Sequence, residues 1–438
     1  MTQIFARVRL ERMNRPPWLL VAALLIAPVR ASAQLLPVPS LPGPVGGIVR
    51  DLGAPVLRDP LVQQIDRAAR GLARDRLDRL EGVARLHPDA IELDRDGNPV
   101  RAREIVVEDP DEALLARAGV AGFALLERQT IEGLEIGYAR FRVPAGMSLR
   151  DALKRMRPIA GVRGISTDPL HFASGSVMPA ARPGGAAPLA ATGALSIGII
   201  DGGVDQRAIT GPLVQQAFAA GGPSPNAHAT AIASLIQGAP SIRGAVPQAR
   251  LLVADVYGRD PAGGSATAIA RAIGWMVRQR VPVVAVSLVG PANPLLARVV
   301  AAARARGTVI VAAVGNDGPA APPAYPASYP EALAVTGVDG RNRALIEAGR
   351  ARHLDYAAPG ADMLASGLAG RTVAVRGTSF AVPFAAARLA RFYAAPDSGE
   401  IAGGLRALDR EARDLGKSGA DSLYGRGLVC GDCRTPNK

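Results

Sequence analysis

Four polar residues in the second half of the chain have the side chains that nucleophilic catalysis requires. They are Asp201 in IIDGGVD, His228 in NAHATAIASLIQG, Asn316 in AAVGNDG and Ser379 in RGTSFAVPFAAA. A serine hydroxyl becomes a nucleophile when a histidine takes its proton, and a carboxylate orients that histidine and stabilises its charged form. An asparagine amide can donate to the oxyanion that the attack creates. Taken singly, each residue also fits a simpler role, and Ser379 alone would be interpreted as a helix cap.

The order of these residues along the chain separates two classes of hydrolase. Aspartate, histidine and serine follow one another, and the asparagine lies between the histidine and the serine. The α/β-hydrolases have the order serine, aspartate, histidine and a G-x-S-x-G turn, which this sequence lacks. Asp205 is a rival carboxylate, and we prefer Asp201 because it directly follows an apolar run.

The elements that must position these residues begin at Leu195. Near-continuous apolar runs, LSIGIID, ARLLVADVYG, VPVVAVSL, GTVIVAAVGN and ALAVTGVD, alternate with helical stretches such as SATAIARAIGWMVRQR and PLLARVVAAARARG. Such runs are typical of parallel strands that helices cover on both faces. We therefore predict an α/β fold with a doubly wound, mostly parallel sheet, whose site lies beyond the carboxyl ends of the strands.

Six segments between Leu195 and Val429 together resemble the subtilisin-like serine peptidases, the subtilase family. They are IIDGGVD, HATAIASLIQG, GAVPQARLLVADVYG, VSLVGP, AAVGNDG and GTSFAVPFAAA, and YGRGLV resembles the family's closing strand. The resemblance implies a triad of Asp201, His228 and Ser379, with the Asn316 amide and the Ser379 N–H binding the oxyanion. It implies that the substrate cleft is walled by two segments: Ser287, Leu288, Val289 and Gly290, and Ala313, Val314 and Gly315. The walls are small and apolar, so we expect an apolar side chain before the scissile bond.

Three positions depart from the family pattern. Ala229 follows the histidine where glycine is usual, Gly202 follows the aspartate where serine or threonine is common, and Val289 replaces a glycine of the substrate strand. They leave open an alternative, a catalytically impaired protein of this fold that binds peptides or acts like a chaperone. A related acid-peptidase family, the sedolisins, shares Gly-Thr-Ser but uses glutamate in place of the histidine, and the His228 segment argues against it. No cofactor is implied as required, and calcium is left open without an identifiable site.

The N-terminus is typical of an export signal. Residues 1–33 contain a basic start, the apolar run WLLVAALLIAPV and a small-residue ASA before Gln34. The apolar run is too short to span a bilayer, which takes about 20 residues. We expect an exported protein, periplasmic or extracellular. In an exported chain the C-x-x-C of Cys430 and Cys433 is expected to form a local disulfide.

The segments between the signal and the catalytic domain differ in composition. Residues 34–100 begin with a Pro/Gly-rich linker and continue with an amphipathic helix, LVQQIDRAARGLARDRLDRL. Residues 101–172 have the pattern of a small β-α-β-β-α-β unit, with a helix capped by Ser148. The resemblance implies that this unit is a propeptide that inhibits its own enzyme. Residues 173–194 are predicted to be an exposed linker that contains the processing site, followed by the catalytic domain, 195–438.

The net charge of +13 raises the question of an anionic partner. Residues 186–438 contain 25 basic and 17 acidic residues, without a dense Lys/Arg run or interleaved aromatic residues. This distribution argues against a nucleic-acid partner and leaves only weak contact with an anionic surface open. The sequence as a whole predicts an exported serine endopeptidase that acts on polypeptides and is made as an autoprocessed precursor.

Overall fold

The computed structural model describes residues 60–180, 195–247 and 249–436, with side chains from residue 71 onward. The predicted export signal, the Pro/Gly-rich linker after it and residues 181–194 lie outside the described residues. The predicted amphipathic helix is α3, Pro60–Leu86. Within the described ranges, no helix is both long and apolar enough to cross a membrane.

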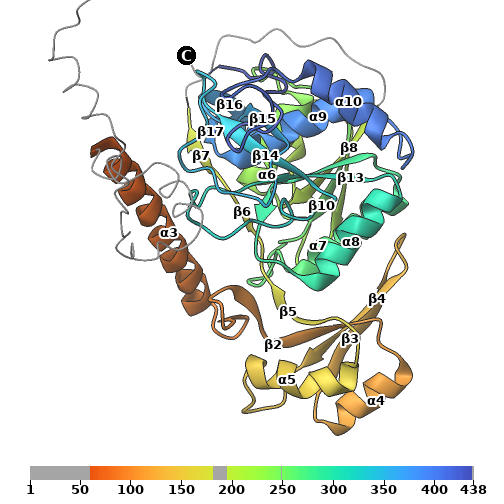
Figure 1. Ribbon diagram of the computed structural model, residues 1–438. Helices are drawn as coiled ribbons and strands as arrows, with labels where there is room; N and C mark the ends of the chain where they lie inside the picture. Colours follow the sequence, from red (N-terminus) through yellow and green to blue (C-terminus); the bar gives the residue numbers. More distant parts are fainter. Residues whose placement is uncertain (1–59, 181–194, 248, 437–438) are drawn as a thin grey trace, which may run out of the picture. The chain divides into compact units, whose positions relative to one another are not determined.

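The catalytic half contains a sheet of seven parallel strands (Figure 1). The order across the sheet is β15-β14-β13-β11-β8-β10-β9. In chain order the strands are β8 (Ser196–Asp201), β9 (Leu213–Ala217), β10 (Arg250–Asp255), β11 (Val283–Val286), β13 (Val309–Ala313), β14 (Leu333–Val338) and β15 (Tyr356–Pro359). The chain crosses from one side of β8 to the other, so the carboxyl end of β8 lies at a topological switch point. Asp201 is the last residue of that strand.

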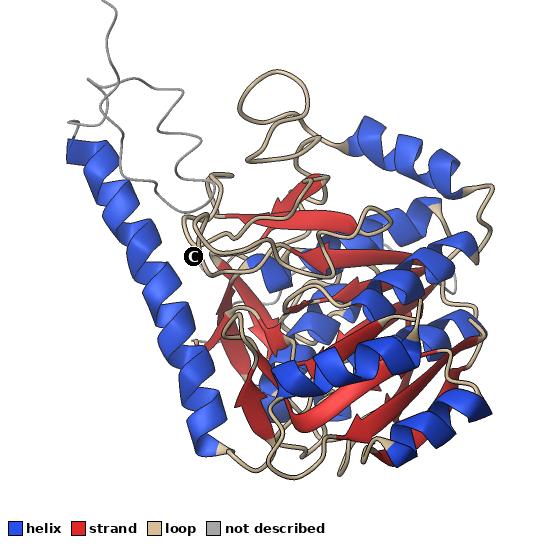
Figure 2. Cartoon of the chain, turned by 60° about the horizontal axis from the view of Figure 1, so that its bottom comes forward, coloured by secondary structure: helices blue, strands red, loops and turns tan. Residues whose placement is uncertain are grey.

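Helices cover both faces of this sheet (Figure 2). One face packs against α6 (Ala227–Gln237), α9 (Val382–Phe392) and α10 (Ile401–Glu411), and the other against α7 (Ala266–Arg278) and α8 (Pro294–Ala305). Asn226, Ser265 and Asn293 begin α6, α7 and α8 by accepting hydrogen bonds from the first backbone N–H groups of each helix. The doubly wound fold predicted from the apolar runs is confirmed.

The preceding α+β unit has the predicted order of elements. It consists of β1 (Ile91–Leu93), β2 (Pro99–Glu108), α4 (Glu112–Val120), β3 (Ala124–Ile131), β4 (Ile136–Arg142), α5 (Leu149–Ala160) and β5 (Ile165–Pro169). Its antiparallel sheet has the order β1-β2-β4-β3, and β5 also pairs with β2. Ser148 caps α5 through a bond from the Asp151 N–H. The unit begins before residue 101, because β1 joins it through a hairpin at Asp96 and Gly97.

The start of the segment predicted as an exposed linker is structured instead. Phe172–Ala173 form β6, which pairs antiparallel with β12 (Leu288–Val289). Ser176–Pro179 form β7, which pairs antiparallel with β17 (Thr372–Arg376), whose other neighbour is β16 (Met363–Ser366). Two sheet edges of the catalytic half supply backbone partners here, and this pairing holds residues 172–173 and 176–179 extended on either side of a bend at Gly175.

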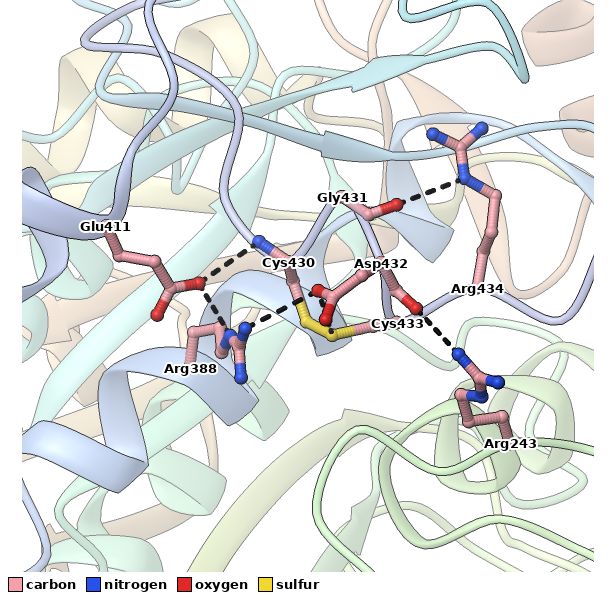
Figure 3. Close-up of a disulfide and its surroundings, with 8 residues drawn as sticks. All are labelled: Arg243, Arg388, Glu411, Cys430, Gly431, Asp432, Cys433 and Arg434. Atoms are coloured by element: carbon pink, nitrogen blue, oxygen red, sulfur yellow. Dashed lines mark hydrogen bonds and ion pairs between the residues drawn. A yellow bond between two sulfur atoms is a disulfide. The ribbon is translucent and has the colours of Figure 1, made fainter. Parts of the chain in front are cut away.

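The C-terminal segment is tied to the catalytic half. Figure 3 shows a disulfide between Cys430 and Cys433, with Arg388 donating to Glu411 and to Asp432 beside it. Arg243 donates to the main-chain oxygen of Asp432 from the other side. The side chains of α9 and α10 therefore hold this segment, while the disulfide closes a local loop within it.

Candidate active site

Asp201 and His228 form a buried pair at the carboxyl end of β8. The Nδ1 atom of His228 lies 2.9 Å from Oδ2 of Asp201, and the other carboxylate oxygen accepts the Gly202 N–H at 2.8 Å. Asp201 is fully buried. This contact favours the tautomer that carries its proton on Nδ1 and leaves Nε2 as a base. The rival Asp205 instead binds the Arg207 guanidinium and caps η2 (Gln206–Ala208).

The pKa of His228 is set by two opposing effects. Burial lowers it, and the charge and hydrogen bond of Asp201 raise it, so the pKa lies above the usual value of 6.5. Nε2 is buried and has no hydrogen-bond partner among the described residues. An imidazole that binds a carboxylate on one nitrogen and has the other nitrogen free is arranged for general-base chemistry.

Ser379 lies in η4 (Thr378–Phe380), directly before α9, and it is fully buried. Its hydroxyl donates to the main-chain oxygen of Ser287 at 3.0 Å and lies 2.7 Å from the hydroxyl of Ser174. The neighbouring Phe380 ring lies 5.2 Å from the His228 ring. In this arrangement Ser379 is hydrogen-bonded to the inserted segment, and its side chain must rotate to reach Nε2 of His228.

Asn316 is oriented with its amide nitrogen free. Its side-chain oxygen accepts the Thr378 N–H at 2.9 Å, while its Nδ2 atom is buried and without a partner in the described part of the chain. Gly315, with φ of +86°, and Gly377, with φ of +139°, provide the turns on either side. An unpaired buried N–H₂ is costly, so this group is placed to bind an acceptor that arrives with the substrate.

The predicted cleft walls divide into two groups. Val289, Gly290, Val314 and Gly315 line the cavity next to Ser174 and Asn316, and the Ser287 oxygen holds Ser379. Leu288 contributes its backbone to the pairing with Ala173 but buries its side chain in the core. Ala313 is wholly buried against the layer of α6 and α9 and does not line the cavity, because successive side chains of a strand point to opposite faces.

Asn226 explains one of the three departures from the family pattern, Gly202. Its side-chain oxygen accepts the N–H groups of His228 and Ala229, which begins α6. A Cβ atom on Gly202 would lie 2.6 Å from the Cβ of Asn226, so this asparagine occupies the space of a side chain at position 202. The methyl group of Ala229 packs in the core without displacing the histidine. An asparagine directly before a predicted helix is a recognisable cap, so the sequence contained this signal.

The described residues give no evidence for a metal site. Among residues 60–180, 195–247 and 249–436, no three His, Cys, Asp or Glu side chains are grouped so that they could hold a metal ion. Of the predicted site residues, Asp201, His228, Ser379 and Asn316 lie together, and Ser174 is an additional residue of the same site. Ser174 lies in a Pro/Gly-rich stretch without periodicity, and we know of no sequence signal that would have found it.

The chain is similar in sequence to known proteases. Over 243 residues the chain is 28% identical to the minor extracellular protease Epr of Bacillus subtilis, a match that covers 54% of this chain and 37% of Epr. It is 29% identical over 248 residues to subtilisin BL of Lederbergia lenta, covering 55% of this chain and 90% of that protein.

A solved structure shares the fold. Fervidolysin of Fervidobacterium pennivorans superposes with a TM-score of 0.62 at 18% identity, covering 78% of this chain and 62% of that one. Residues 194–427 match the subtilase family, which is more than half of the sequence. The chain therefore belongs to the subtilase family of subtilisin-like serine peptidases.

Proposed function

We propose that the protein is an exported serine endopeptidase, made as a precursor that cuts itself, and that Asp201, His228 and Ser379 are its triad. The observation that carries the proposal is the course of residues 172–179. Its two extended stretches pair with β12 and with β17, and the Ser174 hydroxyl between them lies 2.7 Å from the Ser379 hydroxyl. A polypeptide substrate bound by strand addition would take the same course.

The bond that fits self-cleavage joins Ser174 to Gly175. Ser174 lies between the two paired stretches, and its hydroxyl lies 2.7 Å from the Ser379 hydroxyl. The Cα of Gly175 lies 2.7 Å from the position of a Cβ on Gly377, and the Asn316 amide nitrogen lies 2.8 Å from that position. These contacts support the peptide group after Ser174 as the bond that is cut. In this proposal a small side chain precedes the scissile bond of the precursor, and the expected preference for apolar side chains in other substrates stays a prediction.

The reaction proceeds in two halves. The Ser379 hydroxyl attacks the Ser174 carbonyl carbon and transfers its proton to Nε2 of His228, while Asp201 stabilises the imidazolium. The Asn316 amide and the Ser379 N–H bind the oxyanion. The C–N bond to Gly175 then breaks, and His228 protonates the departing amine. A water molecule, deprotonated by His228, hydrolyses the acyl-enzyme and releases a carboxylate at Ser174.

The α+β unit acts in this proposal as an intramolecular inhibitor. Asp168, at the end of β5, accepts from the Thr267 N–H and hydroxyl at the start of α7, and it is fully buried. Arg298 of α8 binds Glu108. The buried Asp168 hydrogen bonds and the partly exposed Arg298–Glu108 ion pair hold the unit against the catalytic half, with its last residues in the cleft. The export signal and an oxidised Cys430–Cys433 pair belong to the same proposal.

The alternative, an impaired protein that binds peptides without cutting them, rested on Ala229 and Val289. Ala229 leaves the Asp201–His228 contact intact, and β12 pairs with β6 despite the Val289 side chain. The intact Asp201–His228 contact favours the active enzyme, whereas the strand pairing is expected of both.

A fluorophosphonate probe, which forms a covalent bond only with an activated serine, tests the proposal. We expect the purified protein to be labelled at Ser379 and to digest casein, and Ser379→Ala to do neither. Ser366→Ala removes another buried serine, on β16, and serves as the matched control that keeps both activities. Peptide binding without labelling or digestion would support the impaired alternative.

A further inference from the structure

Helix α3 precedes the α+β unit, and its described part lies beside the active-site cleft. The residues facing inward follow a helical spacing, with Leu72, Arg76, Leu80 and Ala84 on one face. Leu80 is 6% exposed, whereas Leu77, at the edge of this face, is 47% exposed. The family resemblance covers no part of this helix, and the proposed reaction assigns it no role.

Two arginines of α3 bind a single carboxylate next to the oxyanion residue. Arg76 Nε lies 3.3 Å from one oxygen of Asp317, and Arg79 Nη2 lies 2.7 Å from the other. The Arg76 and Asp317 side chains are only 18% and 19% exposed. Asp317 directly follows Asn316, so the helix is attached to the loop that supplies the oxyanion donor.

Apolar contacts extend this attachment in both directions. Leu72 packs on Gly318, where an added Cβ would lie 3.0 Å from the leucine Cδ1. Toward the C-terminal end, Val83 and Ala84 pack against the cluster that includes Leu170, next to the segment that enters the cleft. Arg76, Arg79 and Leu80 line the same cavity as Ser174 and Asn316. The helix thus spans from the oxyanion loop to the inserted segment.

We propose that Asp317 and Gly318 form an exosite on the catalytic domain, and that α3 is an inhibitory arm that docks on it. This proposal rests on the proposed self-cleavage for its consequence. After the chain is cut at Ser174, the arm remains covalently joined to the α+β unit, whose new carboxyl end still occupies the cleft. Two contacts on one tethered fragment dissociate together, so the arm slows release of the inhibitor. Cleavage and activation are then separate events, and α3 sets the interval between them.

The cut itself makes the test specific. Arg76→Gln with Arg79→Gln changes only the fragment that is removed, so the mature enzyme is chemically identical to wild type. The matched control is Arg74→Gln with Arg85→Gln, which removes the same charge from exposed positions of the same helix. Both full-length proteins are followed in parallel by gel for the cut and by a peptide substrate for activity.

We expect the cut to occur at the wild-type rate in all three proteins. In Arg76→Gln/Arg79→Gln the interval from cut to activity shortens about three- to tenfold, the combined effect of two partly exposed ion pairs. The control keeps the wild-type interval. Raising the salt concentration shortens the wild-type interval more than that of the double variant, because the wild type has the two Asp317 ion pairs to screen in addition to those that the α+β unit makes in both proteins. An unchanged interval in the double variant, or the same shortening in the control, would overturn the proposal.

A non-cutting background separates this proposal from the proposed function. In Ser379→Ala, hydrogen exchange reports docking without any reaction. We expect Arg76→Gln/Arg79→Gln to speed amide exchange in α3 and around Gly318, and Asp317→Asn to do the same. Adding Arg79→Gln to Asp317→Asn should have no further effect on the exchange. If the wild type shows neither the cut nor activity, the proposed function fails. Hydrogen exchange in the Ser379→Ala background still decides whether α3 docks. Equal amide exchange in all variants would contradict the docking of α3 on Asp317 and Gly318.

Discussion

His171 gives the sharpest test of how the cleavage segment is held. It lies three residues before Ser174, fully buried, with its ring against Gly290, where a Cβ would come within 2.6 Å of the imidazole. Its backbone is fixed on both sides, since the N–H donates to the Gly264 oxygen and the carbonyl accepts the Tyr257 hydroxyl. Both ring nitrogens lack hydrogen-bond partners among the described residues. Burial lowers the pKa of His171 to about 4, although the nearby carbonyls of Pro169 and Gly264 oppose this.

The effect of pH on docking follows from the difference between the pKa of His171 in the docked cleavage segment and its pKa in the released one. Released, His171 takes up a proton near pH 6.5, and docked it does so only near pH 4. The contribution to docking is therefore fully present above pH 6.5 and is lost as the pH falls toward 4. At pH 4 the loss amounts to about 3 kcal/mol, a factor of about 150 in the docking equilibrium. A buried carboxyl such as Asp168, whose pKa is raised by burial, acts in the opposite direction.

The substitution His171→Phe isolates this contribution. A phenyl ring fills the same apolar site, removes the titration and leaves no buried nitrogen without a partner. In Ser379→Ala protein, hydrogen exchange of residues 165–179 is measured from pH 7.5 to 4 and corrected with the same peptide unfolded. We expect protection of the histidine protein to fall about 150-fold more than that of the phenylalanine protein over this range. Because other groups are identical in the two proteins, parallel pH profiles would refute the reasoning.

Three further outcomes follow from the site. Asn316→Ala should lower turnover about 10²–10³-fold, the range known for this kind of donor in subtilisin, with little change in KM; an unchanged kcat from steady-state kinetics would exclude Asn316 as the oxyanion donor. Ala229→Gly should leave the self-cleavage rate unchanged and lower the free energy of unfolding by about 1 kcal/mol, since glycine is the poorer helix former. Thermal unfolding of Ser379→Ala protein with and without Ala229→Gly measures the change in stability. A faster cut in Ala229→Gly would mean that the methyl group does hinder His228. Burial lowers the pKa of His228 but Asp201 raises it above 6.5 overall; the self-cleavage rate should therefore rise with pH through a midpoint above 6.5, and a midpoint below 6.5 in the pH–rate profile would contradict that environment.

Local patterns in the sequence predicted the elements well. The apolar runs from Leu195 predicted the parallel sheet, because buried parallel strands need apolar side chains on both faces. Ser148 predicted the start of α5, and Asp96-Gly97 predicted the first hairpin, since both act through the backbone within a few residues. Asp201 could be preferred over Asp205 from its position after a strand, and the contact with His228 agrees with that choice.

Features that depend on distant partners could not be predicted in this way. Residues 176–179 form a strand because the edge of β17 pairs with them, and their own small and Pro-containing sequence carries no strand pattern. Arg79 and Asp317 lie 238 residues apart, and a charge on an amphipathic helix has many possible partners. Successive side chains of a strand point to opposite faces, so the direction of the Ala313 side chain depends on the residue at which β13 ends and the turn begins. The sequence does not specify that residue.

The central claim is that this chain is a peptidase precursor whose first substrate is its own Ser174–Gly175 bond. Mass spectrometry of the purified full chain, beside Ser379→Ala prepared in the same way, tests it most directly. We expect the wild type to yield a fragment ending at Ser174 and a second fragment beginning at Gly175, and the Ser379→Ala protein to keep this bond intact. The same cut in Ser379→Ala, or an uncut bond in an active wild-type enzyme, would contradict the claim.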